Sequence, residues 1–330
     1  MAESVPPLAL TMGEPAGIGG EIAIKAWALR TREAVAPFFL IDDPERLRAL
    51  AAAIGIKIPI AAIASPAEAN FAEALPVLPL SCAVGATPGR LDTANAPATI
   101  ESITRAHALV AAGQAAAMVT NPIQKSTLYA AGFPHPGHTE FLAALDGIDT
   151  PPVMMLAVEG LRVVPVTVHQ SLRTALDALT AEAIVTKARI IGNALRNRFG
   201  IAHPRLAIAG VNPHAGEDGT MGREEIEIVI PAIEALRAEG WQVTGPMSPD
   251  TMFHPGARAT YDVAICHYHD QALIPLKTLD YDHGVNITLG LSFIRTSPDH
   301  GTALDIAGTG AAKPDSLIAA LNLAARLARA

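Results

Sequence analysis

The stretch DVAICHYHDQALIPLK, residues 262–277, decides how the fold is interpreted. It begins with the apolar run 263–266, of the kind that a buried strand uses. Polar side chains follow at once at 267–271, and the apolar chain that comes next ends on Lys277. Imidazoles and a carboxylate directly after a buried strand are typical of an open α/β sheet, because ligands gather at the carboxyl ends of its strands.

The rest of the chain alternates in the same way between strand-like and helix-like segments. Strand-like runs lie at 8–12, 38–42, 75–80, 115–120, 205–211, 262–267 and 284–290. Helical patterns lie at 21–30, 44–55, 97–113, 172–199 and 224–240, and a last helix begins near Pro314. This alternation predicts an α/β fold with a mostly parallel sheet. The segment 153–169 interrupts it and predicts an antiparallel hairpin that turns at Glu159-Gly160.

Composition excludes several classes of protein. The formal net charge is −8 and no polybasic run occurs, which argues against a nucleic-acid surface. Cys82 and Cys266 are the only cysteines, so neither a disulfide framework nor a multi-cysteine zinc site is expected, and a reducing cytoplasm suits the chain. We expect no signal peptide, no membrane span and a cytoplasmic location.

Three histidines close strand-like runs and are candidate metal ligands. His169 follows VVPVTV, His214 follows LAIAGVNP, and His269 follows VAICHY. Three imidazoles at strand ends could hold one divalent ion and leave coordination positions open for a substrate. The alternative is that each histidine caps a strand or binds a loop. Asp250 has two readings as well, as a fourth ligand or nearby base, or as an ordinary turn residue.

Several loops are further candidates for binding. GEPAGIGG (13–20) is a glycine-rich turn that presents backbone N–H groups but does not fit G-x-G-x-x-G. PGHTEF (136–141) carries His138 and Thr139, and Thr139 is also a candidate helix cap. The acids at 224 and 225 suit the first turn of a helix. The polar stretch 292–316 is too long for a simple turn, and Arg295 in it suits either a bound anion or a surface ion pair.

Taken together, these motifs resemble a known family. GEPAGIG, PGHTEF, NPHAGE, YHDQ, GVNITLGL-FIRTS and DHGTALDIAG occur in the expected order over nearly the whole chain. The set resembles the 4-hydroxythreonine-4-phosphate dehydrogenase family of pyridoxal phosphate synthesis. Residues 299–314 also resemble the nucleotide-binding loop of isopropylmalate and isocitrate dehydrogenases, which bind NAD without the G-x-G-x-x-G fingerprint.

The resemblance implies a two-subdomain α/β/α fold like that of isocitrate and isopropylmalate dehydrogenases. Residues 1–130 with 286–330 would form the cofactor side. Residues 131–285 would bind substrate and metal and form a homodimer, with the active-site cleft between the subdomains. The active site would be shared between subunits, with histidines drawn from both.

The resemblance also implies roles for individual residues. The metal ligands would be His169, His214 and His269, holding zinc, magnesium or cobalt. The substrate contacts would be His138, Thr139, Lys277, Asn286 and Arg295, with Lys277 and Asp250 as catalytic groups. The NAD or NADP contacts would be His300, Gly301 and Asp305.

The expected reaction is oxidation of 4-phosphooxy-L-threonine at C3, followed by decarboxylation to 3-amino-2-oxopropyl phosphate. Dehydrogenases of four-carbon sugar-acid 4-phosphates, such as threonate or erythronate 4-phosphate, share most of these motifs and are one alternative. A phosphate acyltransferase of related fold is another, although it needs neither metal nor NAD. The expected partners are a small phosphorylated substrate and a second copy of the chain, with no nucleic acid and no membrane.

Overall fold

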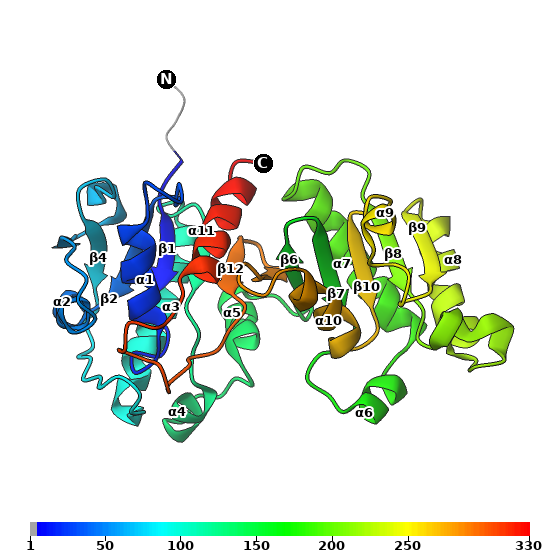
Figure 1. Cartoon of the computed structure of the whole chain (residues 1–330), viewed down its shortest axis with the longest axis horizontal. Helices are drawn as coiled ribbons and strands as arrows, with labels where there is room; N and C mark the ends of the chain where they lie inside the picture. The colour runs from blue at the N-terminus through cyan, green and yellow to red at the C-terminus, as the bar shows by residue number, and fades with distance from the viewer. Residues whose placement is uncertain (1–4) are drawn as a thin grey trace. The chain divides into compact units, whose positions relative to one another are not determined.

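The computed structural model describes residues 5–330, and the chain divides into two compact units (Figure 1). Unit 1 comprises the described residues up to Pro152 together with Leu291–Arg329. Unit 2 comprises Val153–Gly290, with Ala330 grouped alongside it. Among the described residues, the helices lack the combination of length and apolarity that crossing a membrane requires.

Unit 1 contains the first strand–helix repeats and the end of the chain. Its strands are β1 (Leu8–Thr11), β2 (Phe38–Asp42), β3 (Ile60–Ala62), β4 (Leu75–Pro79), β5 (Met118–Thr120) and β12 (Arg295–Pro298). Its α-helices are α1 (Gly19–Ala28), α2 (Pro44–Ala53), α3 (Ala96–Ala111), α4 (Lys125–Ala130), α5 (His138–Asp146) and α11 (Asp315–Leu327), and short 3₁₀ turns are η1 (Pro66–Glu68) and η2 (Thr93–Asn95).

The strands of unit 1 pair in the order β3-β4-β2-β1-β5-β12, and all five pairings between neighbours are parallel. Such sheets are covered by helices on both faces, so their central strands are apolar throughout rather than alternating. The runs LALT of β1 and FFLID of β2 have this character and are buried along their whole length. The parallel sheet predicted from the alternation is therefore confirmed.

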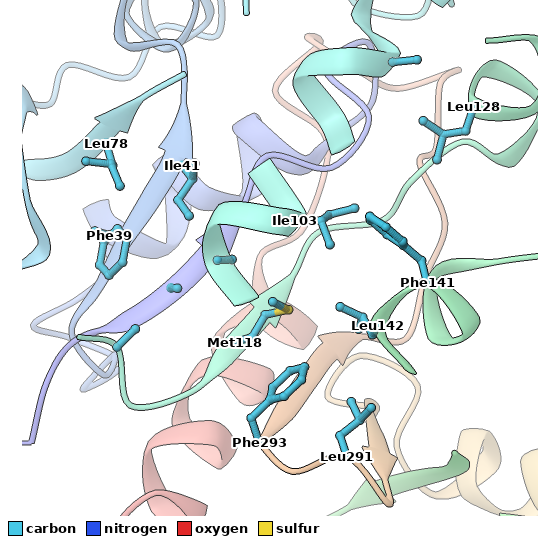
Figure 2. Packing of buried hydrophobic residues seen from close by; sticks show 14 of the residues in the cluster. Phe39, Ile41, Leu78, Ile103, Met118, Leu128, Phe141, Leu142, Leu291 and Phe293 are labelled. Atoms are coloured by element: carbon cyan, nitrogen blue, oxygen red, sulfur yellow. The ribbon is translucent and has the colours of Figure 1, made fainter. Parts of the chain in front are cut away.

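One face of this sheet packs against α3 and α5 (Figure 2). Phe39 and Met118 from the strands meet Ile103 of α3, and Phe141 and Leu142 of α5 complete the cluster. Because α5 buries its apolar side here, residues 131–152 lie in unit 1, whereas the sequence had grouped them with the second subdomain.

Unit 2 contains the hairpin and the later repeats. Its strands are β6 (Val153–Val158), β7 (Leu161–Pro165), β8 (Arg205–Ala209), β9 (Gln242–Met247), β10 (Val263–Cys266) and β11 (Val285–Leu289). Its helices are α6 (Leu172–Asp177), α7 (Ala181–Asn197), α8 (Ile230–Ala238), α9 (Pro255–Arg258) and α10 (His269–Leu279), with the 3₁₀-type segment η3 (Pro213–Gly219) and the π-helical turn η4 (Glu225–Val229).

The strands of unit 2 pair in the order β11-β6-β7-β10-β8-β9. β6 and β7 form the predicted antiparallel hairpin, in which Val158 faces Leu161 across the Glu159-Gly160 turn. β11 also pairs antiparallel with β6, which places residues 286–290 in unit 2 rather than with the cofactor side. β7, β10, β8 and β9 are parallel to one another, and their carboxyl ends therefore share one edge of the sheet.

The prediction of one long helix over 172–199 is wrong, because the segment forms two helices, α6 and α7, with a break between them. Thr180 is extended, with φ −135°, and its side chain accepts a hydrogen bond from the Ala183 amide. A threonine in this geometry caps a new helix. Ser171 caps α6 in the same way, through the Thr174 amide.

The polar stretch 292–316 is only partly a loop, because its first residues form β12. Arg295, Thr296 and Ser297 are all buried in this strand. Thr296 donates a hydrogen bond to the Ala320 carbonyl of α11 over 2.9 Å. Polar side chains that are satisfied inside the protein look like loop residues in a sequence, and β12 was missed for this reason.

We predict that Leu142→Ala destabilises the protein strongly, because this side chain is fully buried between α5 and the sheet. A cavity at such a site costs about 2–5 kcal/mol of unfolding free energy. Leu91→Ala is the matched control, since Leu91 is 42% exposed and should change stability by less than about 0.5 kcal/mol. Chemical denaturation of both variants measures the difference, and equal effects would refute the packing of α5 described above.

Candidate functional site

The predicted metal ligands follow neighbouring parallel strands of unit 2. β7 leads to His169, β10 leads to His269, and β8 leads to His214. Cys266 lies opposite Pro165 and Ile265 lies opposite Ile208, so the chain leaves these three strands at nearly the same level.

β9 continues this edge of the sheet and leads to Asp250. Each of four adjacent parallel strands thus ends in a segment that carries a candidate site residue. This is the place where open α/β sheets bind ligands.

His169 and His269 come close together. Their ring centroids are 5.9 Å apart, and both line a pocket of about 330 Å³ with Tyr268 and Asp270. The Nδ1 atom of His269 lies 2.7 Å from a carboxylate oxygen of Asp270, which leaves Nε2 as the nitrogen available to a metal. A carboxylate on the remote ring nitrogen is the usual support for a metal-binding histidine.

His214 occupies a different position on the same edge. It lies in η3 and is exposed, with the Glu217 carboxylate 4.0 Å from its Nδ1. Across residues 5–330, no three histidine, cysteine, aspartate or glutamate side chains are grouped closely enough to hold one metal ion. A single chain therefore brings His169 and His269 together but does not bring His214 to them. A third ligand would have to come from elsewhere.

Asp250 is an exposed carboxylate beside His214. Ser248 donates a hydrogen bond to it over 2.6 Å, and this bond, with a smaller contribution from the charge of His214, lowers the pKa of Asp250 below its ordinary value. An aspartate of lowered pKa stays ionised and is a weak base. This favours Asp250 as a charged group rather than as a proton acceptor.

Two other predicted residues of unit 2 lie on β11 and α10. Asn286 on β11 faces Leu156 in the sheet, and its Oδ1 is buried without a hydrogen-bond partner among residues 5–330. A buried amide oxygen of this kind is usually satisfied by a ligand or water. Lys277 lies near the end of α10, with its ammonium 5.3 Å from the centre of the Tyr281 ring.

The predicted anion-binding residues of unit 1 gather around β5 and β12. Arg295 is only 5% exposed, so the surface ion-pair alternative is excluded. Its Nε and Nη2 atoms donate to the Thr120 hydroxyl over 3.1 and 2.6 Å. Burial lowers the pKa of Arg295 to about 10, which still leaves the guanidinium charged at neutral pH.

His138 interacts electrostatically with the Arg295 guanidinium. Burial, with a smaller contribution from the Arg295 guanidinium, lowers the pKa of His138 well below its ordinary value. The imidazole is therefore neutral near pH 7, and its Nε2 has no hydrogen-bond partner among the described residues. Thr139 is not a helix cap, because Gly137 precedes α5 in that position and Thr139 lies inside the first turn.

The segment that carries His300, Gly301 and Asp305 is held against α1. Glu21 is fully buried and accepts hydrogen bonds from the amides of Gly308 and Ala312, each over 3.0 Å. Lys25 donates to the carbonyls of Gly310 and Ala312.

Two of the three candidate cofactor residues are accessible, whereas His300 is half-buried with its Nε2 atom inside the protein. Asp305 and Gly301 are exposed, and a Cβ atom added at Gly301 would touch nothing within 4 Å.

Three functional candidates were not identified from the sequence. Thr120 orients Arg295, Glu21 anchors the 308–312 segment, and Glu225 binds the loop that carries His214. Glu225 had been explained by the helix dipole, but it is buried and accepts backbone hydrogen bonds instead. The spacing of Glu21 and Lys25, four residues apart at a helix start, was the one local signal available.

Fold and site define an α/β protein with imidazole and carboxylate groups after the carboxyl ends of parallel strands and a buried guanidinium on β12. A family model described as "Pyridoxal phosphate biosynthetic protein PdxA" matches residues 34–324. The chain belongs to this family. The resemblance inferred from the motifs is therefore confirmed, and the protein is an oxidoreductase of pyridoxal phosphate biosynthesis.

Individual relatives cover the chain almost completely. It is 59% identical over 337 residues to a protein from Methylorubrum populi named 4-hydroxythreonine-4-phosphate dehydrogenase, covering 100% of this chain and 96% of that one. A solved 4-hydroxythreonine-4-phosphate dehydrogenase from Klebsiella pneumoniae is 45% identical, with a TM-score of 0.89 over 98% of this chain and 99% of that chain. A terephthalate 1,2-cis-dihydrodiol dehydrogenase from Burkholderia xenovorans is 31% identical, with a TM-score of 0.65 over 97% of both chains.

We predict that the buried His138 makes stability depend on pH. Well above pH 6.5, histidine is neutral in the folded and the unfolded chain, so His138 adds no pH dependence there. As the pH falls below 6.5, the unfolded chain takes up a proton that the folded protein binds only at much lower pH, and the folded state is destabilised. His138→Gln should therefore show a smaller fall in unfolding midpoint between pH 7 and 5 than the wild type. The exposed His203 provides the control, and a His138→Gln profile that matches both His203→Gln and wild type would refute this.

Proposed function

We propose that the protein is a metal-dependent 4-hydroxythreonine-4-phosphate dehydrogenase. It would oxidise 4-phosphooxy-L-threonine at C3 with NAD or NADP and release CO2 to give 3-amino-2-oxopropyl phosphate. The observation that carries this proposal is the placement of His169, His269, His214 and Asp250 after four adjacent parallel strands. The relatives named above supply the substrate.

The residues present fit a divalent metal. Imidazole nitrogens suit zinc and cobalt, and the Asp270 carboxylate orients His269 as a metal ligand requires. The ion would be held by His169, His214 and His269, with Asp250 beside it. A bound metal supplies Lewis-acid activation of the alcohol, and the dinucleotide accepts the hydride.

The remaining residues would bind and orient the substrate. Arg295 would bind an anionic group of the substrate, with Thr120 fixing the plane of its guanidinium. Neutral His138 would hydrogen-bond without adding charge, and Thr139 lies beside it on α5. Asn286 would use its buried amide to orient a polar substrate group, and Lys277 would neutralise charge or transfer a proton.

His300, Gly301 and Asp305 would contact the dinucleotide. The hydrogen bonds from α1 support this proposal, because they restrain the 308–312 backbone that follows these residues. A restrained loop loses less entropy when it binds a cofactor.

We further propose that the protein is a homodimer, located in the cytoplasm, with each active site completed by a second copy. Exposed apolar side chains on and beside α6 and α10 support an interface on unit 2. Leu172 is 57% exposed, Ile274 is 62% exposed and Tyr281 is 75% exposed. Large exposed apolar groups close to a site commonly mark a protein contact.

The central experiment is NAD(P)H formation from 4-phosphooxy-L-threonine, with and without a chelator. We predict turnover that the chelator abolishes and added zinc or cobalt restores. His269→Ala should be folded but inactive, whereas the exposed His203→Ala should keep wild-type turnover. Turnover of threonate 4-phosphate in preference to 4-phosphooxy-L-threonine, or activity that survives in His269→Ala, would contradict the proposal.

A second prediction concerns Arg295. Arg295→Lys keeps a positive charge but loses the planar group that contacts Thr120, and we expect kcat/KM to fall roughly 10- to 100-fold, as for loss of a charged hydrogen bond. Arg189→Lys is the control, because Arg189 lies in an exposed pair with Glu239. Steady-state kinetics of both variants test this, and an unchanged kcat/KM in Arg295→Lys would remove Arg295 from the substrate site.

A further inference from the structure

The backbone around His214 adopts an unfavourable conformation. His214, Ala215, Gly216, Glu217 and Asp218 all have positive φ, between 41° and 80°. Only one of the five is glycine, and each of the other residues costs roughly 1–2 kcal/mol in this region of φ/ψ space. Such a run persists only where surrounding contacts determine it.

Glu225 supplies contacts of this kind at the entry to the run. Its side chain is buried, and its Oε1 accepts hydrogen bonds from the backbone amides of Val211 and Asn212, both over 2.7 Å. Its Oε2 accepts from the Asn212 side-chain amide over 2.9 Å. One carboxylate thus accepts three hydrogen bonds from the two residues just before the turn.

The turn is also closed tightly around this carboxylate. A Cβ atom at Gly216 would lie 2.5 Å from Glu225 Oε2, and a Cβ atom at Gly222 would lie 2.3 Å from the side-chain nitrogen (Nδ2) of Asn212. A Cβ atom at Gly210 would lie 2.8 Å from Ala215 Cα. Glycine is needed at all three places for the backbone to approach the carboxylate and its partners.

The start of the turn is fixed from the β10 side as well. The His267 ring donates through Nε2 to the Ala209 carbonyl over 2.6 Å, and Gln271 donates to the Gly210 carbonyl over 2.7 Å. Gln271 also accepts from the His267 amide. These bonds connect the segment that carries His269 to the segment that carries His214.

From this geometry we infer that Glu225 is a positioning residue, which holds the strained turn in the one conformation that presents His214 to a metal ion. The inference rests on the proposed function, because it concerns how His214 is presented. Glu225 touches neither substrate nor metal in this account. Its effect is transmitted through Asn212 and the backbone of the turn.

The test is Co²⁺ binding to the full-length metal-free protein, followed by visible absorption. In Glu225→Gln the new amide group faces the Asn212 amide donor, so one acceptor is lost. Loss of such support typically weakens metal binding 10- to 100-fold, and we expect a fall in Co²⁺ affinity of this size. Glu227→Gln is the matched control, because Glu227 lies two residues further on and is exposed beside Arg223.

Asn212→Ala provides a second variant that spares both backbone hydrogen bonds. It removes the side-chain amide, which donates to Glu224 as well as to Glu225, and should weaken Co²⁺ binding by at least about fivefold, the worth of one hydrogen bond. This variant decides the question if Glu225→Gln does not fold. A purely structural role would lower the unfolding midpoint of these variants and leave Co²⁺ affinity unchanged, which would overturn the inference.

His214→Ala separates this inference from the proposed function. If His214→Ala loses Co²⁺ while Glu225→Gln and Asn212→Ala bind it as the wild type does, the metal site stands and the role of Glu225 is refuted. If the wild type binds no Co²⁺, or His214→Ala binds it equally well, the metal site itself fails and the role of Glu225 fails with it.

Discussion

The parallel pairing of β7, β10, β8 and β9 is the constraint on which the proposed chemistry depends. Parallel strands run in one direction, so their carboxyl ends share an edge, whatever the separation of the strands in sequence. Residues as distant as His169 and His269 consequently come within 5.9 Å between ring centres. The antiparallel β6 joins this group through a tight hairpin and leaves that edge undisturbed.

Placing His214 at this edge requires an unfavourable backbone conformation, and hydrogen bonds within unit 2 stabilise it. The turn that carries His214 is strained, and the buried Glu225 carboxylate accepts hydrogen bonds from the backbone amides just before it. On unit 1 a similar principle applies, because Thr120 orients the buried Arg295 and burial keeps His138 neutral beside it. Glu225 and Thr120 would take no part in the reaction themselves, but each restrains a residue that would.

The sequence was sufficient for the architecture and for the family, but only partly for the site. Apolar runs such as 38–42 and the Glu159-Gly160 turn determine local structure, and the structure confirms both. β12 was missed because its polar residues are satisfied by distant partners, and Glu225 was misread because its hydrogen bonds reach back 13 and 14 residues. Long-range hydrogen bonds leave no periodic signal in a sequence, whereas secondary structure does.

Subunit mixing tests most directly the claim that imidazoles from strand ends complete one metal site across two copies. His169→Ala, His214→Ala and His269→Ala should each be inactive, and pairs of them would be unfolded, refolded together and assayed. Random reassociation makes half of the dimers mixed, and one intact site in each gives about a quarter of wild-type activity in at least one pairing. If every mixture stayed as inactive as its parents, the shared metal site would be contradicted.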